Sequence, residues 1–197
     1  MKWIKENLAT NGYCIIENLL SDEEIEEATD SFKKWQKTIP NHDKIHRKID
    51  PHGIYKHHEV GHQRHAWLIR TNKKVQEAFK ILWNTDELIV SFDGSCYIGK
   101  DNKQKDNIWT HTDQGPCNTA QCYQGFVSLT SNKERTLVVY EKSHLYHQKY
   151  FDDKNIKSKS NWHKIDHDVL ENLKETKRIL NVPAGSLVIW DSRCFHQ

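Results

Sequence analysis

Apolar and polar residues follow a helical period in the segment SDEEIEEATDSFKKWQKTI, residues 21–39. Its apolar side chains recur every three or four positions, at Ile25, Ala28, Phe32 and Trp35. Ser21 precedes this pattern and Glu24 follows three residues later, which is the capping-box signature of a helix N-terminus. The segment is therefore predicted to form an amphipathic helix whose apolar side packs on the rest of the protein.

The same spacing returns in NKKVQEAFKILW, residues 72–83, with apolar positions at Val75, Ala78, Phe79 and Leu82. It predicts a second packed helix. A polar, histidine-rich segment, residues 41–67, lies between the two. We expect a further helix late in the chain, in DHDVLENLKETK, with Asp166 at its N-cap. We also predict that the first quarter of the chain is helical.

From about residue 88 the pattern changes to short runs of β-branched and aromatic residues separated by glycine, asparagine and lysine. The runs are LIVSFDGSCYIG, NIWTHTD, QCYQGFVSL, TLVVYE and GSLVIWDSRCFHQ. They predict β-strands, and with the helices they indicate an α+β fold in which an all-β core carries N-terminal helices. We expect one domain over residues 1–197, helical over about 1–87 and with its β core over about 88–197.

The net charge and the lengths of the apolar runs argue against some classes of function. The chain has 29 lysine and arginine residues against 27 acidic ones, a net charge of +2, so a nucleic-acid partner is not expected. The N-terminal stretch MKWIKENLATNGYCII has no unbroken apolar run, which argues against a signal peptide or membrane span. The five cysteines lack C-x-x-C spacing and suggest free thiols. We expect a soluble, cytoplasmic protein without a membrane partner.

The candidate chemistry begins with His111 and Asp113 in WTHTD. Side chains two positions apart on a strand point to the same face, so both residues could bind one ion. A non-haem Fe(II) site needs two imidazoles and one carboxylate on one face. His196 is the best third ligand, because VPAGSLVIWDSRCFH predicts a turn that leads into a strand ending in histidine. A histidine at the end of a late strand can face an H-x-D pair on an early one.

Four ordered strings around these residues, WTHTDQGP, QGFVSLT, RTLVVYEKSHLYH and VPAGSLVIWDSRCFH, resemble the phytanoyl-CoA dioxygenase family of Fe(II)- and 2-oxoglutarate-dependent oxygenases. The resemblance spans roughly residues 10–197. One departure is KSH at residues 142–144, where the family more often has GSH.

The resemblance implies a double-stranded β-helix, a cupin-like jelly roll, with N-terminal helices packed on one sheet. It implies His111, Asp113 and His196 as iron ligands. It also implies three cofactors and cosubstrates, namely Fe(II), 2-oxoglutarate and O₂, and a reaction that hydroxylates a C–H bond of a small-molecule substrate and releases succinate and CO₂. Asp113 favours hydroxylation, since relatives that halogenate replace this carboxylate.

The family usually binds the distal carboxylate of 2-oxoglutarate with an arginine about ten residues beyond the last histidine ligand. Here Gln197 is the last residue, so we expect that a C-terminal segment is missing. If it is not, the carboxylate partner must be Arg193, Arg135 or Arg178. Arg193 is a poor substitute on a strand, because at three positions from His196 the two side chains face opposite surfaces.

Two further residues are candidates for cosubstrate binding. Gln124, Phe126 and Ser128 alternate along one strand, so Gln124 either hydrogen-bonds the cosubstrate or is satisfied within the sheet. The Thr136 hydroxyl either donates to a carboxylate or pairs within its strand.

Other polar and aromatic residues could serve either in the site or in ordinary structural roles. Asp93 either faces the substrate channel or forms an Asp-Gly turn. Tyr55, Arg64 and Trp67 either contact the substrate or serve core and surface roles. The histidines of HQRH (residues 62–65) and HLYH (residues 144–147) have i, i+3 spacing but no third ligand, so neither is expected to bind metal.

Three hypotheses follow: a hydroxylating oxygenase, a jelly-roll metal- or ligand-binding module that has lost turnover, and a zinc hydrolase. Succinate formation separates the first two, and dependence on iron or zinc separates the third. The pattern selects no particular substrate and no oligomeric state.

Overall fold

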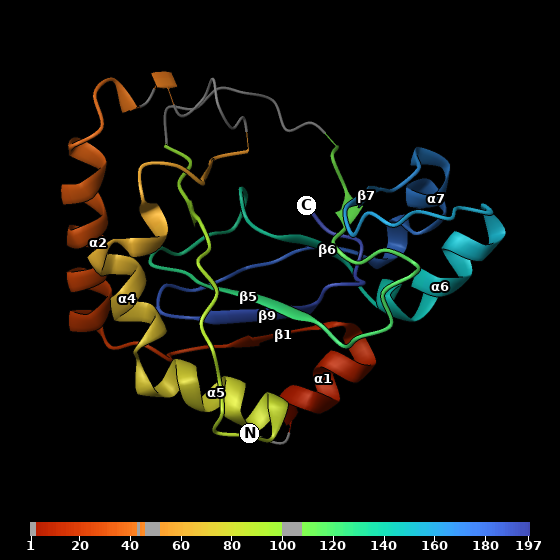
Figure 1. The fold of residues 1–197 in the computed structure, drawn as a ribbon, viewed down its shortest axis with the longest axis horizontal. Coiled ribbons are helices and arrows are strands. Elements are labelled where there is room, and N and C mark those ends of the chain that lie inside the picture. Colours follow the sequence, from red (N-terminus) through yellow and green to blue (C-terminus); the bar gives the residue numbers. More distant parts are fainter. Residues whose placement is uncertain (1–2, 43, 46–51, 100–107) are drawn as a thin grey trace. The chain divides into compact units, whose positions relative to one another are not determined.

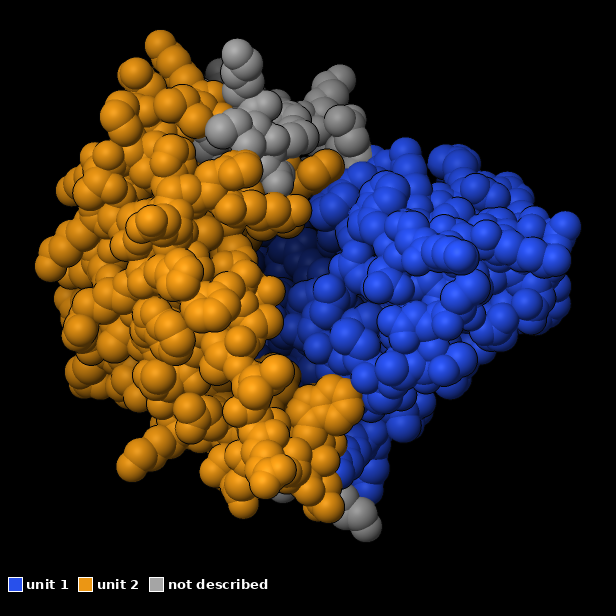
Figure 2. Space-filling model, viewed as in Figure 1, with its two compact units in different colours: residues 1–17, 106–197 blue, residues 18–105 orange. Residues whose placement is uncertain are grey.

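The computed structural model describes residues 3–42, 44–45, 52–99 and 108–197 (Figure 1). The chain divides into two compact units, coloured separately in Figure 2. Unit 1 comprises residues 1–17 and 106–197, and unit 2 comprises residues 18–105. The assignment of a single domain stays a prediction. Because unit 1 joins both ends of the sequence, its central sheet pairs an early strand with a late one.

That sheet has the order β1-β9-β5 and is antiparallel (Figure 1). Its strands are β1 (Tyr13–Ile16), β5 (Tyr123–Val127) and β9 (Leu187–Asp191). All five residues of β9 are buried, as expected for a central strand with partners on both edges. In the register Gln124 lies opposite Trp190, and Phe126 lies opposite Val188. These four side chains therefore share one face of the sheet.

A second group of strands surrounds His196. The strand β4 (His111–Thr112) pairs with β7 (His163–Lys164), and β6 (Val138–Tyr140) pairs with β8 (Lys177–Ile179). Isolated antiparallel bridges from His196 to His111 and to Val139 connect the two pairs. Among the described residues the largest sheet has three strands, so strand pairing shows a mixed helix and sheet fold and does not by itself confirm the predicted jelly roll.

The remaining elements of unit 1 are mainly helical: α1 (Trp3–Asn11), α6 (Ser143–Asp153), α7 (His167–Asn172) and η2 (Lys174–Thr176). Buried side chains of α6 and α7, including Tyr150, Phe151 and Leu170, form one apolar cluster with Phe195. This cluster fixes the chain immediately before His196. Gly12 ends α1 with a φ of +87°, and a Cβ there would lie 2.4 Å from Cys194 Sγ, so the turn requires glycine.

Unit 2 contains α2 (Asp22–Lys37), β2 (Ile54–Tyr55), η1 (Val60–His62), α4 (Arg64–Arg70), α5 (Lys73–Trp83) and β3 (Ser95–Cys96). The strands β2 and β3 pair with each other. The buried side chains Phe32, Trp35, Ile39, Tyr55 and Val60 form its apolar cluster. No helix among the described residues is long and apolar enough to cross a membrane.

The predicted helices are confirmed. Ser21 and Glu24 form both hydrogen bonds of the capping box at α2, and Val75, Ala78 and Leu82 are buried on α5. Asp166 is the N-cap of α7, but its carboxylate pairs with Lys154 rather than capping the helix. The helix α6 was not predicted from the sequence.

Several strand predictions are wrong. The first quarter is not all helical, since Tyr13–Ile16 forms β1. In LIVSFDGSCYIG only Ser95–Cys96 is a strand, and Ile89 is fully exposed. The last strand does not end in histidine: β9 ends at Asp191, and a turn separates it from His196. In each case the apolar pattern was correctly located, but the pairing partner that makes a strand was not visible in the local sequence.

Candidate metal centre

His111 and His196 are brought together by backbone pairing. The His111 N–H donates to the His196 carbonyl and the His196 N–H donates to the His111 carbonyl, both at 2.9 Å. The Asp113 N–H donates to the Ser192 carbonyl at 3.1 Å, in the turn that follows β9. His111, the first residue of the H-x-D motif, and His196 are thus held side by side, as the sequence predicted.

The three side chains converge. One potential ligand atom from each of His111, Asp113 and His196 lies within 4.8 Å of the others, and no other such cluster occurs among the described residues. His111 Nε2 lies 3.5 Å from Asp113 Oδ1, and His196 Nε2 lies 3.5 Å from Asp113 Oδ2. Both imidazoles are about 5% exposed, whereas the Asp113 side chain is 27% exposed. The carboxylate therefore forms the accessible side of the cluster.

The other ring nitrogen of each histidine contacts a backbone carbonyl. His111 Nδ1 lies 3.1 Å from the Trp109 carbonyl, and His196 Nδ1 lies 3.0 Å from the Cys194 carbonyl. A carbonyl only accepts, so Nδ1 donates in both rings and Nε2 is the ring nitrogen that faces the carboxylate. This is the arrangement in which metal-binding histidines are usually held. The donor set fits a divalent transition metal bound by two imidazoles and one carboxylate.

The Asp113 carboxylate is kept ionised by its neighbours. Burial raises its pKa, but the adjacent His111 and His196 rings and the Gln124 amide lower it more, and its pKa lies well below the ordinary value. Gln124 Nε2 donates to Asp113 Oδ2 at 2.8 Å. Asp113 is therefore an ionised candidate ligand, and the hydrogen bond from Gln124 orients its carboxylate.

Aromatic rings surround the imidazoles. Trp109 stacks on His111 with a centroid distance of 4.7 Å, and Trp162 stacks on it at 5.5 Å. The Trp190 ring lies 5.5 Å from that of His196. Trp162 is 51% exposed, so it gives the site an accessible apolar edge. We did not predict roles for these tryptophans. Two of them could have been found in the sequence, because Trp109 lies two residues before His111 and Trp190 lies six residues before His196.

The candidate cosubstrate residues lie in different surroundings. Gln124 is next to the cluster, with its Oε1 buried and without a hydrogen-bond partner. Thr136 is in the bend before β6, and its hydroxyl is likewise buried without a partner. Arg193 lies in the turn after β9, where its guanidinium donates to both oxygens of buried Asp191, at 2.8 and 2.6 Å. The assignment of these residues to cosubstrate binding stays a prediction.

The two other candidate arginines lie elsewhere in unit 1. Arg178 pairs with Glu141 at 2.9 Å, and Arg135 is exposed in the bend at residues 133–136.

The histidines of HLYH both contact backbone carbonyls within unit 1. His144 Nε2 contacts the Ala9 carbonyl, and His147 Nε2 contacts the Gln114 carbonyl.

The remaining candidates belong to unit 2. Asp93 accepts a hydrogen bond from Ser91 in an exposed segment without regular structure, and the Tyr55 hydroxyl accepts one from Gln36. Arg64 pairs with Glu27, and Trp67 is partly covered by the Arg70 guanidinium. The HQRH histidines are separated, with His62 exposed in η1 and His65 buried on α4.

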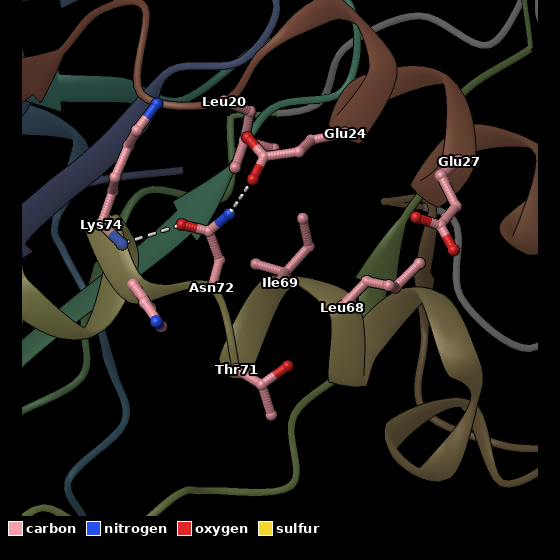
Figure 3. Close-up of a pocket in the computed structure, with 9 residues that line it drawn as sticks. Leu20, Glu24, Glu27, Leu68, Ile69, Thr71, Asn72 and Lys74 are labelled. Atoms are coloured by element: carbon pink, nitrogen blue, oxygen red, sulfur yellow. Dashed lines mark hydrogen bonds between the residues drawn. The ribbon is translucent and has the colours of Figure 1, made fainter.

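Unit 2 also has a surface pocket between α2 and the start of α5 (Figure 3). Several of its polar groups have partners: the Asn72 amide donates to Glu24, and the Asn72 side-chain oxygen accepts from the Lys74 N–H. Glu27 pairs with Arg64. The pocket is therefore accounted for by helix capping and ion pairing.

The chain is similar in sequence to a known protein family and to a curated protein. The family model for phytanoyl-CoA dioxygenase matches residues 8–197. A curated relative, Ava biosynthesis cluster protein O of Aspergillus versicolor, is 26% identical over 218 residues, which cover 98% of this chain and 70% of that protein.

Two solved structures share the fold. GlcNAc Inducible Gene 2 of Candida albicans aligns with a TM-score of 0.68 and 13% identity. The alignment covers 98% of this chain but only 58% of that one. The non-heme alpha-ketoglutarate-dependent carbocyclase SnoK from nogalamycin biosynthesis aligns with a TM-score of 0.56 and 14% identity, covering 100% of this chain and 76% of that one.

Proposed function

Since this chain belongs to the phytanoyl-CoA dioxygenase family, we propose that it is an Fe(II)- and 2-oxoglutarate-dependent oxygenase that hydroxylates a C–H bond of a small molecule. The observation that carries the proposal is the convergence of His111, Asp113 and His196, with both Nε2 atoms directed at the carboxylate. The names of two similar proteins, a biosynthesis-cluster protein and a carbocyclase, support a small-molecule substrate.

The three ligands have distinct tasks. The imidazoles of His111 and His196 supply neutral donors whose tautomer is fixed by backbone carbonyls. Asp113 supplies the negative charge, and Gln124 orients it. A metal ion bound here would be held by His111, Asp113 and His196, because one ligand atom of each lies within 4.8 Å of the others.

Three ligands on one side leave the opposite coordination positions for cosubstrate and O₂. When bound, Fe(II) and 2-oxoglutarate supply the oxidising power: one oxygen atom of O₂ enters the substrate C–H bond, and the other enters succinate as CO₂ is released. The chain contributes geometry and a partly dry site, since Trp109 and Trp162 cover the His111 ring.

Binding can be tested before any substrate is identified. Under anaerobic conditions, Fe(II) and then 2-oxoglutarate are titrated into the protein, and the visible charge-transfer band of the chelated complex is recorded. We expect a band in the wild type and its loss in His196→Ala, with an unchanged far-UV circular dichroism spectrum. A folded His196→Ala variant that retains the band would refute the assignment of His196.

Turnover separates the proposal from its alternatives. Under air, succinate formation that requires Fe(II) and is lost in Asp113→Ala supports the oxygenase. A band without succinate across a substrate panel favours a binding module that has lost turnover. Zinc-dependent hydrolysis without succinate favours a hydrolase.

A further inference from the structure

Trp190 occupies a particular position beside the candidate metal centre. It is the penultimate residue of β9, directly opposite Gln124 in the sheet register. Its ring packs against Phe126 and against the His196 imidazole, with centroid distances of 6.1 and 5.5 Å. The residue is only 9% exposed. The indole therefore lies next to a metal ligand but is not itself a ligand.

The indole N–H has no hydrogen-bond partner. Trp190 Nε1 is buried, and so is Gln124 Oε1, which likewise lacks a partner. Buried donors in folded proteins are almost always paired, because an N–H that loses water without gaining an acceptor is costly. The two orphan groups lie on the same face of the sheet, on neighbouring strands, and Gln124 also contacts Asp113. The N–H of Trp190 thus lacks an acceptor among the described residues, although its ring packs on the imidazole of His196.

The acceptor expected at this site is a carboxylate, because 2-oxoglutarate carries a second carboxylate beyond the end that chelates metal. In unit 1 the guanidinium of Arg193 is occupied by Asp191 and that of Arg178 by Glu141, and Arg135 lies exposed in the bend at residues 133–136. An N–H donor to a charged acceptor makes one of the stronger hydrogen bonds in proteins. An indole N–H, which only donates and cannot be protonated or deprotonated at neutral pH, suits this role.

We propose that the Trp190 indole N–H donates a hydrogen bond to the distal carboxylate of 2-oxoglutarate, and that Trp190 is a specificity-determining residue for the cosubstrate. This inference rests on the proposed function. It assigns selection of a 2-oxo acid with a second carboxylate to a residue six positions before His196 on the chain.

The test compares two ligands in two proteins. Anaerobic Fe(II)-loaded wild type and Trp190→Phe are titrated with 2-oxoglutarate and with 2-oxopentanoate, which has a methyl group in place of the distal carboxylate. Trp190→Phe should weaken 2-oxoglutarate binding about tenfold, equivalent to about 1.4 kcal/mol, and should change 2-oxopentanoate binding less than twofold. Fe(II) affinity should stay within about twofold, consistent with a residue that is not a ligand.

Controls keep the outcomes distinct. Trp3→Phe removes an exposed tryptophan of α1 and should leave both ligands unaffected. If Trp190→Phe does not fold, benzothienylalanine at position 190 replaces only the N–H by sulfur. Equal losses for both ligands, or no loss for either, would overturn the inference. Failure of the wild type to bind Fe(II) or any 2-oxo acid would instead overturn the proposed function.

Discussion

The two histidines of the candidate centre are oriented by the same local device. In each case Nδ1 contacts the carbonyl of the residue two positions earlier, Trp109 for His111 and Cys194 for His196. The carbonyl selects the tautomer, and the Nε2 atoms of both rings then face Asp113. Because the device uses backbone atoms, it does not depend on the identity of residues 109 and 194.

Asp113, in contrast, depends on a side chain for its orientation. We predict that Gln124→Leu lowers metal affinity by about 10–100-fold, the usual effect of removing a group that orients a ligand. Leucine has a similar volume, and the Gln124 Oε1 is buried without a partner, so the melting temperature without metal should not fall. Anaerobic Co(II) titration and thermal unfolding measure the two effects.

The matched control for this prediction is Gln148→Leu. Gln148 is an exposed residue of α6 whose amide donates to Asp152, so this substitution should leave metal affinity unchanged. If Gln124→Leu binds Co(II) as tightly as the wild type, the hydrogen bond to Asp113 has no role in metal binding.

At the scale of elements, the sequence predicted the ligands better than the strands that carry them. His111 and Asp113 were found from their spacing, and His196 from its place after an apolar run. The turn between Asp191 and His196 was not predicted, because it depends on the Asp191–Arg193 ion pair and on the Gly12 carbonyl, which accepts from the Asp191 N–H. The contact between Gly12 and Asp191 joins residues far apart in sequence, so local periodicity carries no sign of it.

A buried histidine, His65, is expected to make the stability of unit 2 depend on pH. His65 of α4 is 4% exposed and packs against Phe32 and Trp35 of α2, and its Nε2 lies 3.1 Å from Ser95 Oγ. Burial, assisted by the charge of Arg70, lowers the pKa of His65 from 6.5 to about 4. Protonation is therefore easier in the unfolded chain than in the folded one.

The sign of the effect follows from linkage. Between pH 6.5 and 4 the unfolded state binds the proton and the folded state does not, so stability falls as pH falls. We predict that His65 alone lowers the free energy of unfolding by on the order of 2 kcal/mol between pH 7 and pH 5. His65→Gln should remove this part of the pH dependence in metal-free urea denaturation.

The exposed His167, with a side chain 71% exposed, provides the comparison. His167→Gln should retain the full pH dependence of the wild type. Identical pH dependence in the wild type and in His65→Gln would show that His65 titrates in the folded state as it does in the unfolded chain.

At the scale of the whole molecule, metal binding should be linked to folding. Unit 1 combines residues 1–17 with residues 106–197, and the ligands come from β4 and from the chain after β9. Their correct spacing exists only when these segments are paired. A metal that binds the folded state alone stabilises it by about 2.7 kcal/mol at a free concentration 100 times its Kd.

For a chain of this size, that stabilisation corresponds to a rise in melting temperature of about 5–10 °C. We expect Co(II) to produce it under anaerobic conditions, a chelator to reverse it, and Asp113→Ala to abolish it. If Asp113→Ala shows the same rise, the ion binds elsewhere, for example among the other 11 histidines of the sequence. A rise confined to the wild type ties the stability of unit 1 to its three candidate ligands, because the metal then stabilises the fold only when the Asp113 carboxylate is present.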